Sequence, residues 1–519
     1  MVQTAVLIIF SFGLLYVVQL YLAFRRGTTQ GTAPSLVVHS PRGTIFLAYL
    51  GSPQADLIYS RGNTRITDLP AGMYIPQYVS PPYARKPAIL IQFTEQATIK
   101  EVVSYRARFP KPVKQYGALS FFGKNIVASE GDEWKRYRKV TAPSFSERNN
   151  QLVWNETCRI MMDMFDNVWQ WKDEIVLDNC IDITLPIALF VIGVAGFGRR
   201  ISWTDDQKVP PGHRIAFKDA LHIVSTEIFV KLAVPKWAMG LTQRFRNVQT
   251  AFDELRVYML EMIEARKNSE KKEERYDLFS SLLDANEEES DGEAKLSDDE
   301  LLGNIYIFLV AGHETTAHTL CYAFGLLALY QDEQETLYQH IKSIIPDGRT
   351  PTYEEMNLFT RSMAVLYETL RLYPPAISIP KVAAEDTRLT VSNSAGEKKV
   401  VPVPRGCDIV ISTPALHYNP RYWEDPYVFR PERFLEKDWP RDAFLPFSAG
   451  ARACIGRRFF EIEGIAILTM LVSKYKIEVK EEPQFAMENL KQRRERLLAN
   501  MPGITLTPVR VPLVFKKRA

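Results

Sequence analysis

The stretch FSAGARACIG, residues 447–456, places one cysteine, Cys454, between an arginine and a glycine in a short glycine-containing loop. Gly450 permits a tight turn before the cysteine, and the apolar pattern FFEIEGIAILTMLV predicts a helix that begins just after Cys454. The dipole and the free N–H groups at the start of such a helix favour a thiolate. Cys454 is therefore a candidate nucleophile or metal ligand.

The overall composition excludes some classes of protein. The chain has 519 residues, 46% of them hydrophobic, which is enough for a sizeable core. Its formal charge of +3 is mild and its basic residues are dispersed, so we expect no nucleic-acid partner. The remaining cysteines form no C-x-x-C pair that would suggest zinc or a redox dithiol, and we interpret them as inert buried residues: Cys158, Cys180, Cys321 and Cys407.

The N-terminal sequence predicts a membrane anchor. No charged side chain occurs in MVQTAVLIIFSFGLLYVVQLYLAF, and two arginines follow it directly. An apolar helix of this length can cross roughly 30 Å of hydrocarbon, and positive charge behind it rather than before it argues against a cleaved signal peptide. We therefore predict one transmembrane helix at residues 1–26, a tether at 27–53 and a catalytic domain at 54–519 on the cytosolic side.

The remaining patterns predict a mainly α fold with minor β-sheets. Ser297 and Glu300 form a capping box before an apolar run without proline up to Tyr330, which predicts one long central helix. A second capping box at Thr352 opens another helix, which two prolines close after Tyr373. Alternating residues at about 398–413 indicate a small sheet, and LVVHS and TIFLAYL indicate short extended segments in the tether.

The cysteine loop resembles the haem-binding loop of the cytochrome P450 superfamily, F-x-x-G-x-R-x-C-x-G, with every specified position filled. The resemblance implies that Cys454 is the axial thiolate ligand of the iron of haem b. It also implies that Phe447 packs beside the sulfur, that backbone N–H groups around the sulfur tune its basicity and that Gly456 keeps bulk away. Arg452 would pair with a haem propionate, because a guanidinium matches a carboxylate in charge and geometry.

A second element of the resemblance is structural. Glu368-Thr369-Leu370-Arg371 matches the family's E-x-x-R, and the spacing of three places both charged side chains on one helical face. The sequence PERF supplies the matching downstream arginine, Arg433. We expect Glu368, Arg371 and Arg433 to form a buried network that supports the cysteine loop and takes no part in the chemistry.

The long helix carries a third element, because AGHETT, residues 311–316, matches the family's oxygen-activation segment. The resemblance implies that Ala311 and Gly312 face the haem, that Gly312 allows close approach, and that Thr315 and Glu314 relay protons to oxygen. HETTAH is not a zinc motif, because its histidines are five residues apart and roughly 140° apart around the helix.

Further propionate contacts are implied elsewhere. Trp134 and Arg138 match the family's W-x-x-x-R helix and lie one turn apart, so both would address the propionates. Lys381 stands where many relatives have an arginine, and a lysine supplies charge without the planar fork. On other faces of the helix that carries Trp134 and Arg138, three basic residues could dock an acidic reductase: Lys135, Arg136 and Lys139.

The resemblance thus implies a membrane-bound haem-thiolate monooxygenase of the endoplasmic reticulum, of a type similar to fungal members. Electrons would come from NADPH through a separate flavoprotein reductase, because the chain has no G-x-G-x-x-G strand–helix unit. Apolar residues at family substrate positions suggest a hydrophobic substrate such as a terpenoid, another secondary metabolite or an aromatic xenobiotic: Ala376, Ile377, Ile379, Phe308 and parts of 213–234. Two alternatives remain: a reductase-independent haem-thiolate isomerase or dehydratase, and a haem protein that carries or senses a ligand.

Overall fold

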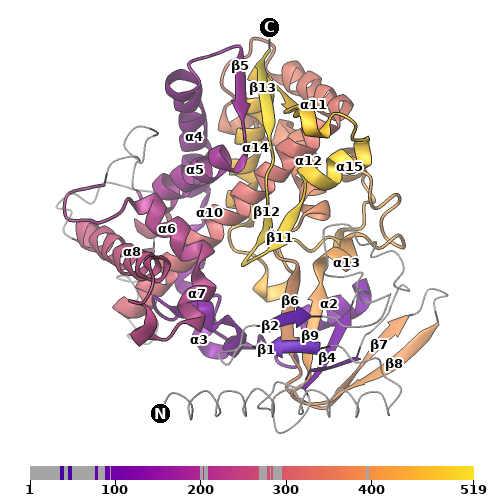
Figure 1. Cartoon of the computed structure of the whole chain (residues 1–519). Helices are drawn as coiled ribbons and strands as arrows, with labels where there is room; N and C mark the ends of the chain where they lie inside the picture. The colour runs from indigo at the N-terminus through magenta and orange to yellow at the C-terminus, as the bar shows by residue number, and fades with distance from the viewer. Residues whose placement is uncertain are drawn as a thin grey trace, which may run out of the picture. The chain divides into compact units, whose positions relative to one another are not determined.

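The computed structural model describes residues 36–39, 45–48, 76–79, 88–93, 95–198, 203, 209–267, 277–280, 282–283, 295–392 and 397–518 (Figure 1). The predicted anchor at residues 1–26 lies outside the described residues, as does most of the tether. None of the helices in the described ranges has both the length and the hydropathy needed to cross a bilayer. The chain divides into two compact units, Met1–Gln115 with Ser378–Ala415, and Tyr116–Ile377 with Leu416–Ala519.

The first unit is built mainly from short strands. Its largest sheet has the order β3-β4-β9-β6, in which β4 and β9 are parallel and the other neighbours are antiparallel. Two antiparallel pairs, β1–β2 and β7–β8, and helix α2 complete the described part of the unit. The bounds are β1 Leu36–His39, β2 Ile45–Ala48, β3 Pro76–Val79, β4 Ala88–Phe93, α2 Gln96–Ser104, β6 Ser378–Val382, β7 Thr387–Ser392, β8 Lys398–Val403 and β9 Asp408–Ser412.

The strands expected in the tether are present as β1 and β2. The single sheet expected at about 398–413 is wrong in its pairing, because β8 pairs with β7 whereas β9 lies between β4 and β6. Alternation of side chains predicts a strand but not its partner. Here β8 pairs with the preceding strand β7, whereas the parallel partner of β9 is the distant strand β4.

The second unit is mainly helical, as predicted. Its helices are α3 Gly131–Thr141, α4 Glu147–Asp163, α5 Ile181–Val191, α6 Phe217–Thr226, α7 Ile228–Ala233, α8 Gln243–Lys267, α10 Asp298–Leu329, α11 Gln331–Ile344, α12 Thr360–Leu372, α14 Arg457–Lys474 and α15 Leu490–Leu497. Helix α13, Thr413–His417, lies where the two units join along the chain. Two small antiparallel sheets complete the unit: β10 Tyr475–Val479, β13 Leu513–Lys517 and β5 Glu174–Leu177, and β11 Asn500–Pro502 with β12 Leu506–Pro508.

The long central helix is confirmed as α10, which spans 32 residues. Its N-terminus is the predicted capping box, in which the Glu300 N–H donates to Ser297 Oγ at 3.3 Å and the Ser297 N–H donates to the Glu300 carboxylate at 2.9 Å. Helix α10 packs against α5, α12 and α14 and is buried along nearly all of its length (Figure 1). An apolar helix of this kind is stabilised mainly by the surface it buries.

The helix expected to open at Thr352 is interrupted. The Thr352 N–H does donate to the Glu355 carboxylate at 2.9 Å, but the following turn, Tyr353–Leu358, is a 3₁₀-helix and α12 starts only at Thr360. Between them Phe359 has a non-helical backbone, and its buried ring stacks on Trp154 of α4. Burial of this ring accounts for a break that local propensity does not predict.

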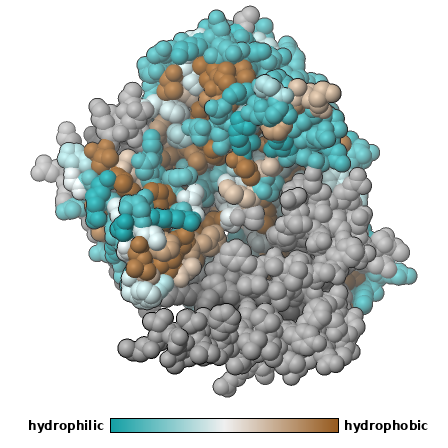
Figure 2. All heavy atoms as spheres, viewed as in Figure 1, coloured by the Kyte–Doolittle hydropathy of each residue, from teal (hydrophilic) through white to brown (hydrophobic). Residues whose placement is uncertain are grey.

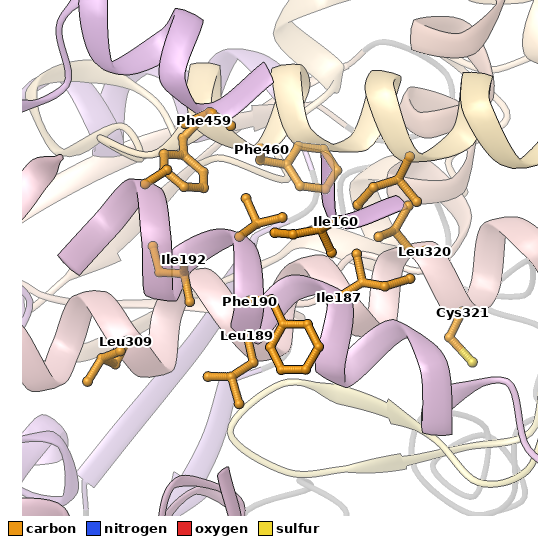
Figure 3. Close-up of a cluster of buried hydrophobic side chains, with 14 of the residues drawn as sticks. Ile160, Ile187, Leu189, Phe190, Ile192, Leu309, Leu320, Cys321, Phe459 and Phe460 are labelled. Carbon is orange, nitrogen blue, oxygen red and sulfur yellow. The ribbon is translucent and has the colours of Figure 1, made fainter. Parts of the chain in front are cut away.

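The core fixes the helix that carries residues 311–316 and the helix that follows the cysteine loop. Figure 3 shows apolar side chains of α4, α5, α10 and α14 packed together. The residues drawn there include Ile160, Ile187, Leu189, Phe190, Leu309, Leu320, Phe459 and Phe460. Because these side chains interdigitate in one cluster, α10 and α14 are held in a fixed relation to one another.

Candidate active site

The cysteine loop is a short irregular segment that leads into α14. Ser448 and Gly450 adopt left-handed backbone conformations, with φ of 57° and 67°, and a 3₁₀ turn at Gly450–Arg452 follows. The Cys454 N–H donates to the Phe447 C=O at 2.8 Å and closes the loop. Cys454 is exposed, whereas the other cysteines are buried, so the loop presents one accessible thiol.

The electrostatic setting of this thiol differs from the sequence prediction. We expected a depressed pKa, but desolvation by the surrounding protein raises the pKa of Cys454. The backbone N–H groups of Gly456 and Arg457 and the charges of Arg138 and Arg457 oppose that effect without overcoming it. Such a thiol stays protonated until a metal cation takes up the charge of the thiolate, and the N–H groups then stabilise the bound anion.

Phe447 and Gly456 stand on either side of Cys454 in the loop sequence. The Phe447 ring lies 5.7 Å from that of Phe460, and the Arg457 guanidinium stands 5.4 Å from the centre of the Phe447 ring. A Cβ atom at Gly456 would lie 3.9 Å from Phe145, which is an ordinary contact. The packing of the chain itself therefore does not require glycine at this position.

Helix α3 lies against the cysteine loop through two side chains. Arg452 places its guanidinium 4.3 Å from the centre of the Trp134 indole, pairs with Glu130 at 3.0 Å, and donates to the C=O groups of Ile126, at 3.1 Å, and Ser129. Its guanidinium is thus held by the protein itself.

Arg138, one turn after Trp134, differs from Arg452. Its charge acts on Cys454, yet it makes no ion pair or side-chain hydrogen bond within the described ranges. An unpaired cation close to a candidate metal-binding thiol fits an anionic group such as a haem propionate. The donor set of this unit, a thiol with N–H groups directed at it and an unpaired arginine nearby, therefore fits a haem.

The oxygen-activation segment is the accessible part of α10. From Leu301 to Ala328 every residue of the helix is buried except Ala311, Gly312 and Thr315, which lie on one face. The Thr315 hydroxyl donates to the Ala311 C=O at 2.6 Å. A Cβ atom at Gly312 would come within 3.1 Å of Ile192 Cδ1, so the absence of a side chain there also allows α10 to pack on the segment after α5.

Glu314 lies next to this face but is buried. Burial raises the pKa of Glu314 to about 7, and the Ser225 hydroxyl of α6 acts in the opposite direction. A carboxyl group with this pKa exchanges protons readily at neutral pH, which is the requirement for a general acid or base. Glu314 and Thr315 are adjacent in the chain, so the segment combines a titratable group with an accessible hydroxyl.

Glu368, Arg371 and Arg433 are in contact and fully or almost fully buried. Arg371 donates to both carboxylate oxygens of Glu368, at 2.6 and 2.7 Å, and Arg433 Nε donates to the same carboxylate at 3.2 Å. Arg371 also donates to the C=O groups of His417 and Pro426, at 2.9 and 2.7 Å. These contacts connect α12 to the coil that leads to the cysteine loop.

His417 extends this network and has no sequence signal of its own. Its Nε2 accepts the Leu445 N–H at 2.8 Å, so Nδ1 carries the proton and donates to the Arg371 C=O at 3.0 Å. Burial lowers the pKa of His417 to about 3, which keeps the ring neutral. Because Leu445 lies two residues before Phe447, His417 connects the buried network directly to the cysteine loop.

The structure also shows the surroundings of Lys381 and Arg136, which the sequence predicts to contact a haem propionate and a reductase. Lys381 lies in β6 of the first unit and is buried, while the other candidate residues belong to the second unit. Arg136 is not available to a reductase, because it is bound to the Glu300 carboxylate and to the Lys295 C=O, at 2.6 Å. The prediction that Arg136 belongs to a reductase-docking surface is therefore wrong, because its guanidinium connects α3 to the start of α10.

Comparison with known proteins identifies the family. The family model described as Cytochrome P450 matches residues 87–506. Cytochrome P450 monooxygenase 124 of Postia placenta is 62% identical over 422 residues, which are 81% of each chain. Cytochrome P450 monooxygenase ORF6 of Penicillium roqueforti is 32% identical over 482 residues, which cover 83% of this chain and 81% of the relative. Cytochrome P450 monooxygenase prx9 of Penicillium rubens is 31% identical over 479 residues, which cover 83% of this chain and 80% of the relative. The resemblance to fungal members is confirmed, and the chain belongs to the cytochrome P450 family of monooxygenases.

Proposed function

We propose that this protein is a membrane-bound haem-thiolate monooxygenase that inserts one oxygen atom of O₂ into a hydrophobic organic substrate. The electrons come from NADPH through a separate flavoprotein reductase. The observation that carries the proposal is that, between Leu301 and Ala328, α10 is accessible only at Ala311, Gly312 and Thr315, in a unit whose exposed cysteine is Cys454. Helices α10 and α14 pack against one another, so the helix that carries Thr315 adjoins the helix that follows the cysteine loop.

The residues have distinct roles in this proposal. Cys454 binds the iron, and the N–H groups of Gly456 and Arg457 stabilise its thiolate. Arg138 and Trp134 hold the propionates, and Arg452 supports them through its stacking on Trp134. When bound, haem b supplies the activation of O₂ and the transfer of one oxygen atom to carbon.

Proton delivery is the task of α10. Thr315, whose hydroxyl donates to the Ala311 C=O, would hold the proton at its Oγ, and Glu314, which is part protonated at neutral pH, would supply it. Both groups are already in place before substrate binds, so little reorganisation is needed.

The substrate class follows from apolar surroundings. Phe308 of α10 meets Phe145 edge to face, with ring centres 5.8 Å apart, and both rings lie close to the candidate haem residues along the chain. Apolar side chains at these positions favour an apolar substrate such as a terpenoid, another secondary metabolite or an aromatic xenobiotic.

Membrane association is part of the proposal. The apolar N-terminal segment at 1–26 supports a single-pass anchor in the endoplasmic reticulum membrane, with the catalytic part in the cytosol. Independent support comes from large apolar side chains that are exposed beside α7 and α8, namely Trp237 at 80% and Leu241 at 68%. Figure 2 shows hydrophobic side chains on the side of the molecule that carries these helices. Contact with membrane lipid would cover them.

The proposal is tested by isotope incorporation. The full chain in membranes is combined with NADPH, a flavoprotein reductase and a panel of apolar substrates under ¹⁸O₂. We expect one labelled oxygen atom in the product and no turnover when NADPH is omitted. Conversion of a substrate without NADPH, or a product that lacks the label, would instead identify a reductase-independent isomerase or dehydratase.

A further inference from the structure

Three side chains from α12 and α14 form a closed triangle of hydrogen bonds beside the cysteine loop. Arg457 Nε donates to Glu461 Oε1 at 2.8 Å, and Arg457 Nη2 donates to the Tyr367 hydroxyl oxygen at 2.8 Å. The Tyr367 hydroxyl in turn donates to the same Glu461 oxygen at 2.6 Å. Because each side chain bonds both of the others, none of them can turn without breaking two hydrogen bonds, and those to the carboxylate are of the strong, charge-assisted kind.

Two members of the triangle are buried, and the third is partly exposed. Glu461 and Tyr367 are buried, and the Tyr367 ring packs against the rings of Phe434 and Phe444, at 5.5 and 5.1 Å between centres. Burial raises the pKa of Tyr367 to about 12, so its hydroxyl keeps the proton that it donates to the carboxylate. The side chain of Arg457 is about half exposed. A buried pair thus fixes the orientation of a cation at the surface.

This orientation brings the cation to the cysteine loop. The Arg457 guanidinium stands 5.4 Å from the centre of the Phe447 ring, and a cation over an aromatic face is favourable. The Phe447 C=O accepts the Cys454 N–H at 2.8 Å, so Phe447 and the thiol belong to one hydrogen-bonded turn. The charge of Arg457 also favours the thiolate form of Cys454. Contacts therefore run without interruption from Tyr367 through Arg457 to the turn that carries the thiol.

Arg458, the next residue of α14, carries the same charge in a different place. Its Nη1 lies 3.6 Å from Glu461 Oε2, and its side chain is 44% exposed, close to the exposure of Arg457. Among the described residues its guanidinium stands over no aromatic ring, whereas that of Arg457 stands over Phe447. The two arginines thus separate the effect of a charge held against the cysteine loop from the effect of charge alone.

We propose that Tyr367 is a positioning residue for the haem iron: together with Glu461 it holds the Arg457 guanidinium against Phe447, and the charge held there raises the reduction potential of the iron. One electron from the flavoprotein reductase converts ferric to ferrous iron, and no bond or proton is exchanged. A cation nearby favours the ferrous form, because the added electron is stabilised by positive charge. The inference rests on the proposed function in one respect, the assignment of Cys454 as the iron ligand.

The role of the charge is tested by a redox titration of the purified, haem-loaded full chain, followed by absorbance with dithionite as reductant. The measured quantity is the ratio of ferrous to ferric protein at the potential where wild type is half reduced. In Arg457→Gln we expect this ratio to fall roughly three- to tenfold. Arg458→Gln is the control for charge, because it removes one cation from the neighbouring position, and its ratio should change by less than about twofold.

The role of Tyr367 is tested without any change of charge. Tyr367→Phe keeps the packed ring but frees the guanidinium to turn toward water, so we expect the ratio to fall by about twofold or more. In the double variant with Arg457→Gln the loss of the hydroxyl should cause no further fall, because Tyr367 acts through Arg457. Tyr353→Phe is the matched control, since the Tyr353 hydroxyl donates to the Glu147 carboxylate at the same distance of 2.6 Å, and it should keep the wild-type ratio.

The outcomes decide each step separately. An unchanged ratio in Arg457→Gln, or an equal fall in Arg458→Gln, would overturn the role of the charge held at Phe447. An unchanged ratio in Tyr367→Phe, an equal fall in Tyr353→Phe, or a further fall in the double variant would overturn the assignment of Tyr367. Failure of the proposed function is distinguishable, because wild-type protein would then lack a thiolate-type band with carbon monoxide before any variant is compared.

Discussion

The guanidinium of Arg452 lies 4.3 Å from the centre of the Trp134 indole and joins the cysteine loop to helix α3. The same guanidinium is paired with Glu130 and donates to the Ser129 C=O, so it is held by protein groups on several sides. Arg138, on the same helix as Trp134, has its charge near Cys454 and no ion pair in the described ranges. The two arginines therefore differ in what they stabilise.

Substitution of these two arginines should separate folding from haem retention. Arg452→Ala is expected to destabilise the protein by about 1–3 kcal/mol, because it removes hydrogen bonds and the contact with Trp134. Arg138→Ala is expected to lower the haem-to-protein ratio with little loss of stability, measured by denaturant unfolding of the haem-free protein. Equal effects of both substitutions on stability would contradict this distinction.

Removing Arg371 from the buried network of Glu368, Arg371 and Arg433 should destabilise the folded protein strongly. Arg371→Ala leaves the Glu368 carboxylate buried with less compensation, so we expect a loss of about 3–5 kcal/mol in the free energy of unfolding. The matched control is Arg361→Ala, because Arg361 pairs with the exposed Glu432 at 3.1 Å and such pairs contribute about 0–1 kcal/mol. Denaturant titration of both variants checks the contrast, and similar losses would refute it.

Glu314 should make stability depend on pH. Its pKa in the folded protein is about 7, above the ordinary value of 4.5, so the folded state binds the proton more tightly than the unfolded chain does. The resulting stabilisation is fully present below about pH 4.5 and is lost as the pH rises through 7, and it amounts to about 3 kcal/mol. Glu314→Gln should lose less stability than wild type between pH 5 and 8, whereas the exposed Glu436→Gln should follow wild type.

Gly312 should not tolerate a methyl group without a compensating change. In Gly312→Ala the new Cβ would meet Ile192 Cδ1 at 3.1 Å, so we expect a loss of about 1–3 kcal/mol. Ile192→Val removes that Cδ1 atom, and the double variant should recover part of the loss. Gly117→Ala meets nothing within 4 Å and is the control. Additive effects of the two substitutions would show that this contact does not cause the loss.

The sequence predicts those features that are local. The capping box at Ser297 defines the start of α10, and the loop at 447–456 defines the thiol-bearing turn before α14, because each depends on neighbouring residues alone. Features that depend on distant contacts are not predictable in this way. The break at Phe359 comes from burial against Trp154, and β9 does not pair with β8 because it lies between β6 and the distant β4.

The same division holds within the candidate site. The direction of the pKa shift of Cys454 depends on the protein packed around it, which outweighs the N–H groups that the sequence predicts. His417 belongs to no motif, since a lone histidine at the end of a short helix is common. Its role follows only from the neighbours that the fold brings to it.

The absorption spectrum of the reduced protein with carbon monoxide tests the central claim most directly, in wild type and in Cys454→Ser. We predict a thiolate-type Soret band in wild type that is absent from the variant, since Cys454 is the exposed thiol of the second unit. A histidine-type band in correctly folded wild-type protein, or a thiolate-type band that persists in Cys454→Ser, would contradict the assignment of Cys454 as the iron ligand.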